Sequence, residues 1–138
     1  PGAQEFRGRV VPMLNWSEID DPAAQSRADR TFARSNFPCG PRSFLAIVED
    51  DANEDKADGR KSIYAGDAII VDPDRPLKPG NMVMIKHKGE IKVRQYRPRS
   101  DHVEFAPLNP EFDEVKVDTV ASVIVIGVVV ETARQRVN

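Results

Sequence analysis

The chain has 138 residues, 40% of them hydrophobic and 30% charged, and its 20 Lys and Arg nearly balance 22 Asp and Glu. This composition indicates one globular domain with a single core, and it lacks the excess positive charge with which a protein binds nucleic acid directly. The single Cys39 excludes an internal disulfide, and no apolar run approaches the roughly 20 residues that span a bilayer. We therefore expect a cytoplasmic protein with no membrane partner.

The first third of the chain predicts little regular structure. Residues 9–16 are apolar and β-prone, with a proline that suits an edge, so we expect a lead-in strand or arm. Residues 17–36 are mostly polar and predict a long loop, with a weak helix candidate at 23–28. Two prolines and a glycine in residues 37–41 mark a turn before a strand at 43–48.

The middle of the chain alternates between strands and polar turns. Residues 49–61 are strongly acidic and predict an exposed loop. A Gly-Asp turn at 66–67 then leads into an apolar, β-branched strand that Pro73 ends, which is typical of a buried strand with a functional turn at its mouth. Strands at 81–86 and 91–96 alternate apolar and charged residues and predict a half-exposed hairpin.

The last third continues the β pattern. We expect a strand at 103–108, a proline-containing loop at 109–113 and a long buried strand, or a pair of strands, at 120–130. Strands with turn signals between them dominate, and the chain has no internal repeat. The predicted fold class is therefore mainly β, with one short helix or helical turn at most.

Six segments, in this order along the chain, resemble the C-terminal domain of LexA and phage CI repressors. They are the Val11-Pro12 arm and residues 44–48, 66–73, 89–94, 107–110 and 126–129. The resemblance covers nearly the whole chain and implies a mainly β domain of the β-clip type that dimerises. In that family the domain follows an N-terminal helix-turn-helix domain that binds DNA. On this interpretation residues 1–9 are a linker or a remnant of expression, and residues 10–138 are the oligomerisation domain.

The LexA-like family also contains self-cleaving serine peptidases, and this chain differs at each part of their machinery. The nucleophile is the Ser of a Val-x-Gly-Asp-Ser-Met motif, which aligns with Ala52, and a methyl group cannot attack a carbonyl. The general base is a Lys that aligns with Arg94, whose guanidinium stays protonated. The cleaved Ala-Gly bond aligns with Ile19-Asp20, a bulkier and charged pair. The resemblance therefore predicts a member that does not cleave itself.

Two other interpretations of this region stay open. If the alignment slips within the acidic loop, Ser62 is the nucleophile, and the base is then one of three lysines: Lys86, Lys88 or Lys92. Ala52 could instead replace a natural Ser by engineering, although Asp50, Asn53 and Arg94 depart from the motif as well. By the same resemblance, the acidic loop and Arg94 occupy the two halves of the family's active cleft. We therefore expect an ion pair between Arg94 and this loop.

We expect neither a metal ion nor a cofactor. Asp51, Asn53 and Asp55 alternate as in a calcium loop, but the sixth position lacks Gly and the twelfth lacks Glu. His87 and His102 lie in or beside polar turns, with no Cys or His at ligand spacing.

Taken together, these residues and the resemblance predict a non-catalytic oligomerisation domain of a phage-type transcriptional repressor, or of a host regulator with the same architecture. It would hold two DNA-binding heads on an operator, and an antirepressor protein would release it. The alternative is an active self-cleaving peptidase that uses Ser62. The residues predicted for self-association are Val123, Ile124, Val125, Ile126, Val128 and Val130, flanked by Pro107 and Pro110.

Overall fold

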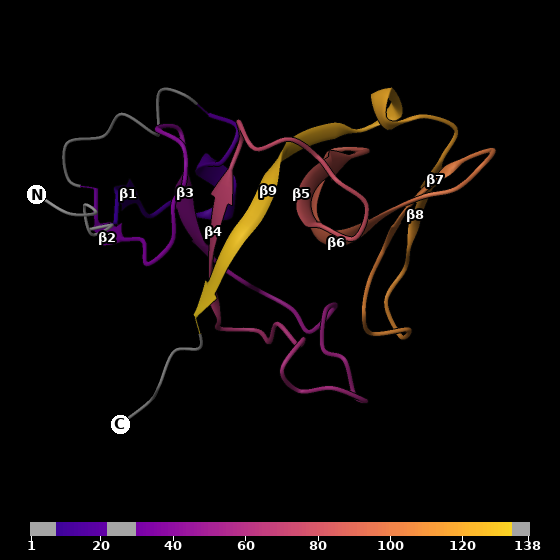
Figure 1. Cartoon of the computed structure of the whole chain (residues 1–138), viewed down its shortest axis with the longest axis horizontal. Helices are drawn as coiled ribbons and strands as arrows, with labels where there is room; N and C mark the ends of the chain where they lie inside the picture. The colour runs from indigo at the N-terminus through magenta and orange to yellow at the C-terminus, as the bar shows by residue number, and fades with distance from the viewer. Residues whose placement is uncertain (1–7, 22–29, 134–138) are drawn as a thin grey trace, which may run out of the picture.

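The computed structural model describes residues 8–21 and 30–133, and within them it is nearly all β-structure (Figure 1). The predicted helix at 23–28 lies outside the described residues. The elements are β1 Val10–Pro12, η1 Trp16–Glu18, β2 Phe32–Arg34, β3 Phe44–Ile47, β4 Ala68–Asp72, β5 Met82–His87, β6 Glu90–Pro98, β7 Val103–Ala106, β8 Val115–Val117, η2 Val120–Ser122 and β9 Ile124–Ala133.

Seven strands form one antiparallel sheet in the order β3-β4-β9-β5-β6-β7-β8. The last strand of the chain lies in the middle of this sheet, between β4 and β5, and is drawn yellow in Figure 1. All five residues of β4 are buried, as the apolar, β-branched run at its centre predicts. The remaining strands, β1 and β2, pair with each other as a small second sheet.

The small sheet is joined to the large one through β3. Leu14 donates a backbone hydrogen bond to the Leu45 carbonyl (2.9 Å), and Val11 belongs to the same buried cluster as Leu45 and Ile70. The segment that follows β1 is therefore fixed against the large sheet before it turns into η1.

The apolar core lies on both faces of the central strands. Successive side chains of a strand point to opposite faces, so Met84 packs in one cluster with Ile69 while its neighbours Val83 and Ile85 pack in another with Phe105. Each of these five side chains is completely buried. Alternation within β5 thus divides the core in two.

The structure confirms the mainly β fold class and corrects several local predictions. The predicted loop at 17–36 contains strand β2, and residues 115–117 form a strand, β8, that we did not predict. The long strand predicted at 120–130 begins instead with η2 and continues to Ala133. None of the described helices is long and apolar enough to cross a membrane.

Candidate functional site

The acidic loop folds back onto β6 and onto the segment after β7. Asn53 donates its side-chain amide to the Val93 carbonyl (2.8 Å), and its side-chain oxygen accepts from the Leu108 amide (3.3 Å). The Asn109 amide donates to the carbonyl of Ala52 (2.9 Å). Ala52 and Asn53 are almost fully buried, so the prediction of a wholly exposed loop was wrong for these residues. The structure thus places Ala52 beside the strand that carries Arg94.

Hydrogen bonds within this loop and across its base hold it in shape. The carboxylate of Asp50 accepts from the Ala52 amide (3.0 Å), and that of Asp51 accepts from the Ala65 amide (2.9 Å). At the turn before β4, Gly66 has a φ of 93°, a conformation that favours glycine, and its amide donates to the Val48 carbonyl (2.8 Å). The Gly-Asp turn therefore closes the base of the acidic loop.

Arg94 is buried, with only 4% of its surface exposed. Its guanidinium donates from Nη1 to the Val93 carbonyl (2.9 Å) and from Nε to the Asp113 carbonyl (3.2 Å). Burial lowers the pKa of Arg94, while the negative charges of Asp50 and Asp113 act in the opposite direction. Both acidic side chains thus interact with Arg94 electrostatically, but among the described residues neither comes within ion-pair distance of it.

Little open space remains beside these residues. A hollow of about 50 Å³ is lined by residues that include Trp16, Asn53 and Val93. Trp16 is held there because its indole N–H donates to the Ile47 carbonyl (2.8 Å). Since ligand pockets usually measure about 300 Å³ or more, this hollow has no room for a bound peptide.

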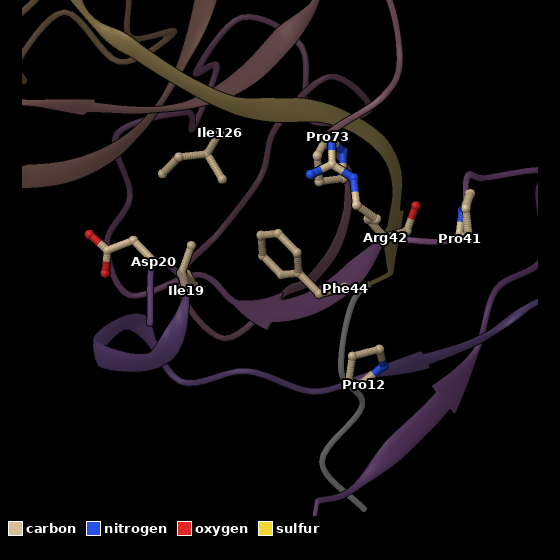
Figure 2. A pocket seen from close by; sticks show the side chains of 9 residues that line it. Pro12, Ile19, Asp20, Pro41, Arg42, Phe44, Pro73 and Ile126 are labelled. Carbon is tan, nitrogen blue, oxygen red and sulfur yellow. The ribbon is translucent and has the colours of Figure 1, made fainter. Parts of the chain in front are cut away.

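The predicted cleavage pair Ile19-Asp20 directly follows η1, and Ile19 belongs to the same buried core cluster as Val48 and Val93. Ile19 is buried and lines a separate groove of about 470 Å³ together with Phe44 and Ile126 (Figure 2). Asp20 forms an ion pair with Lys86, and the hydrogen bond from Lys86 lowers the pKa of Asp20. Ile19 and Asp20 thus line this groove, and neither is among the residues that line the hollow beside Asn53.

A buried ion pair that sequence reasoning missed fixes the segment before Ile19. Glu18 and Arg30 meet through two hydrogen bonds, Nη2 to Oε2 at 2.7 Å and Nη1 to Oε1 at 3.2 Å. Glu18 also accepts from the amide of Asn15 (2.9 Å) and completes a capping box around η1. The spacing of Asn15 and Glu18 is the sequence signal that could have located this turn.

The alternative nucleophile Ser62 is buried against the backbone of its own loop. Its hydroxyl oxygen accepts from the Asp55 amide (2.7 Å) and can donate to the Asp55 carbonyl (3.1 Å) or the Asp58 carbonyl (3.3 Å). Among the lysines proposed as its base, Lys92 lies 3.5 Å from Glu90, and Lys86 pairs with Asp20.

The residues predicted for self-association lie in two separate places. On β9 and just before it, Val123 and Val128 are buried, whereas Ile124 is 63% exposed. Val125, Ile126 and Val130 are half-buried and pack against core clusters. Pro107 and Pro110 follow β7, which β5 and β6 separate from β9, so the sheet does not bring them to the exposed end of β9.

The histidines lie apart from the site. His87 ends β5, and His102 lies between Glu104 (2.9 Å) and Asp101 (2.6 Å), whose carboxylates raise the pKa of its imidazole. No three His, Cys, Asp or Glu side chains of residues 8–21 and 30–133 group as metal ligands.

The mainly antiparallel β fold is the one expected of a LexA-like C-terminal domain. Residues 15–130 match the Peptidase S24-like family model, and the chain belongs to that family. The resemblance to LexA-like C-terminal domains is thereby confirmed.

The chain is also similar to three individual proteins of known type. They are HTH-type transcriptional regulators for the conjugative elements R391 of Providencia rettgeri, SXT of Vibrio cholerae and pMERPH of Shewanella putrefaciens. Each is 26% identical to this chain over an alignment of 136 positions, and the alignment covers 91% of the chain. The chain spans 60% of the length of each relative.

Proposed function

We propose that this chain is the non-cleaving regulatory and self-association domain of a bacterial transcriptional repressor. The relatives that it matches are HTH-type transcriptional regulators, which supports a role in transcription. In this proposal the domain joins two copies of a repressor in the cytoplasm. Both DNA-binding heads then engage one operator, and the second contact becomes effectively intramolecular.

The observation that carries the proposal is the chemistry at the positions of the family's nucleophile and base. Ala52 offers no hydroxyl, and its carbonyl is bonded to Asn109 inside a closed loop. Arg94 donates hydrogen bonds to two carbonyls and cannot accept a proton as a lysine base does. Ile19 lines the groove with Phe44 and Ile126, and Asp20 pairs with Lys86. In this proposal, self-cleavage therefore lacks both its nucleophile and its base.

The Ser62 peptidase is the second candidate, and the contacts of Ser62 do not favour it. A serine nucleophile needs an adjacent base, but Ser62 bonds only to backbone groups of Asp55 and Asp58 among its hydrogen-bond partners in the described residues. We therefore treat Ser62 as a structural hydroxyl that closes the acidic loop.

Incubation of the chain at raised pH tests this proposal, because alkaline conditions deprotonate a lysine base. We expect no fragments by mass spectrometry over hours, while a self-cleaving LexA treated in parallel is cut. The appearance of two fragments that Ser62→Ala abolishes would establish the peptidase and contradict our proposal.

A repressor that does not cleave itself needs another route of release. In our proposal an antirepressor protein binds this domain or its partner domain, whether the repressor belongs to a phage or to its host. The full-length repressor should then stay intact while DNA damage induces the cell, as an immunoblot would record. A repressor that is cut during induction would contradict this part of the proposal.

A further inference from the structure

A cluster of charged side chains surrounds His102 in the turn between β6 and β7. This turn belongs to the end of the large sheet that carries β7 and β8, at the right of Figure 1. The imidazole of His102 lies between two carboxylates. Its Nδ1 is 2.6 Å from Oδ1 of Asp101, and its Nε2 is 2.9 Å from Oε1 of Glu104. The ring therefore connects the turn to the first residues of β7.

Three cations face this cluster from the neighbouring elements. In the strand register Glu104 lies opposite Arg97 of β6 and Lys116 of β8, and opposed residues share one face of a sheet. Arg99, in the turn itself, lies 3.4 Å from Oε2 of Glu104. The charges of these arginine, lysine and carboxylate groups stay constant near neutral pH, whereas the charge of His102 changes there.

The number of hydrogen bonds that His102 donates depends on its proton. A protonated imidazole donates from both nitrogens, so it holds Asp101 and Glu104 at the same time. A neutral imidazole donates from one nitrogen only, and the lone pair on the other nitrogen then faces a carboxylate. Asp101 is the carboxylate that turns away into water, because its side chain is 84% exposed while that of Glu104 is only 19% exposed.

We propose that His102 is a pH-sensitive switch that holds the β6–β7 turn closed while its proton is bound. When the proton leaves, the contact with Asp101 is lost and this end of the sheet opens more readily. One backbone hydrogen bond marks the closed turn, because the Arg99 amide donates to the His102 carbonyl (2.9 Å). The inference concerns the local stability of the turn, and it depends neither on self-association nor on the loss of self-cleavage.

The direction of the pH dependence follows from the two carboxylates. Their hydrogen bonds, that of Glu104 before that of Asp101, raise the pKa of His102 above its ordinary value of 6.5, although burial and the charge of Lys116 oppose them. The added stability is therefore present below pH 6.5 and is lost as the pH rises through the raised pKa. The hydrogen bonds with His102 also lower the pKa of both carboxylates, so the contact is lost in acid only below their ordinary range.

Hydrogen exchange at the Arg99 amide tests the switch in the wild-type chain. The exchange rate is measured by NMR at about pH 6 and about pH 8 and is corrected for the intrinsic rate at each pH. We expect the protection of this amide to be roughly two- to fivefold lower at the higher pH, the range for the loss of one exposed ionic contact. The buried amides of β4 serve as an internal reference for any change in global stability.

Two histidine variants show whether the effect belongs to His102. The chain has two histidines, so His87→Gln, at the end of β5, is the matched control. His102→Gln should make the protection of the Arg99 amide equal at both pH values, whereas His87→Gln should keep the wild-type difference. The proposal is overturned if the wild type shows no difference, or if the difference persists in His102→Gln.

Titration of the His102 imidazole by NMR gives a second readout, one that a merely structural role would not move. Glu104→Gln and Asp101→Asn should each lower the pKa of His102, because each removes one of the two negative charges bonded to the ring. A pKa of His102 that stays at its wild-type value in either variant would contradict the two-sided contact on which the switch depends.

Discussion

Arg94, which the resemblance to LexA-like domains aligns with their catalytic base, forms structural contacts in this fold. Its guanidinium donates a hydrogen bond to the Asp113 carbonyl and so joins β6 to the loop at Asp113. Only 4% of the residue is exposed. Burial of a cation is unfavourable unless hydrogen bonds and nearby negative charges compensate it, and here carbonyls together with Asp50 and Asp113 do so. The side chain is therefore a structural cation held in a nearly closed site.

Replacement of Arg94 by Ala should lower the free energy of unfolding by about 2 kcal/mol, because two carbonyls lose their donor and the packed stem is removed. Urea unfolding at low and high salt measures this loss. The charge interaction with Asp50 and Asp113 should make the stability of the wild type more sensitive to salt than that of Arg94→Ala. Arg94→Met, which keeps most of the stem, should lose less. Equal stability and equal salt dependence of the wild type and Arg94→Ala would show that the guanidinium contributes nothing.

At the scale of elements, the central strands β4 and β9 approach unusually closely at Gly127. A Cβ built on Gly127 would lie 2.7 Å from Cγ1 of Val71 and 2.9 Å from the carbonyl carbon and oxygen of Asp72. Real Cβ atoms do not come that close to a backbone, so the two strands would have to separate. Gly127 therefore allows β4 and β9 to pack closely at the point where β9 still pairs with β5 but its pairing with β4 ends.

Gly127→Ala should destabilise the domain by about 1–3 kcal/mol, since the added methyl group overpacks a buried strand pair. Gly59→Ala is the control, because a Cβ there would meet only the Tyr64 hydroxyl oxygen at 3.7 Å, an ordinary contact. Thermal or urea unfolding of both variants measures the difference. Equal stabilities would mean that β4 and β9 can move apart at little cost.

At the scale of the whole molecule, the small sheet and the segment after β1 are joined to one another by a buried ion pair. The side chains of Glu18 and Arg30 are only 7% and 2% exposed, and Arg30 also donates to the Met13 carbonyl (2.7 Å). This pair connects η1 to the start of β2 and holds Ile19 in the groove next to Ile126. The groove lined by Ile19 and Ile126 therefore depends in part on this buried ion pair.

Glu18→Gln should cost about 3 kcal/mol of stability, because it removes a buried negative charge that accepts two hydrogen bonds from the Arg30 guanidinium. Arg42→Gln breaks an ion pair whose side chains are 68% and 43% exposed, and it should cost much less because solvent screens an exposed pair. Chemical unfolding of the two variants compares a buried with an exposed pair. Similar losses in both would contradict the structural role of Glu18.

The fold class could be predicted because strand signals are local, whereas the missed elements depend on distant partners. Strand β2 is three residues in a polar stretch, and it forms because Phe32–Arg34 pairs with Val10–Pro12. The burial of Asn53 inside an acidic run was missed for the same reason, since its side chain bonds to Val93, 40 residues further along the chain. Composition predicts the average exposure of a segment and not the contacts of one residue.

The sequence by itself determined the mainly β class and the family, because strand periodicity and side-chain identity are properties of the chain. Only the tertiary structure decided that β4 pairs with β9 no further than Val128, so that Ile124–Ile126 pairs with β5 alone among the described strands. The end of β4 at Asp72 sets this limit, and it follows from long-range strand pairing. Such pairing is set by how the whole core packs, which no local pattern encodes.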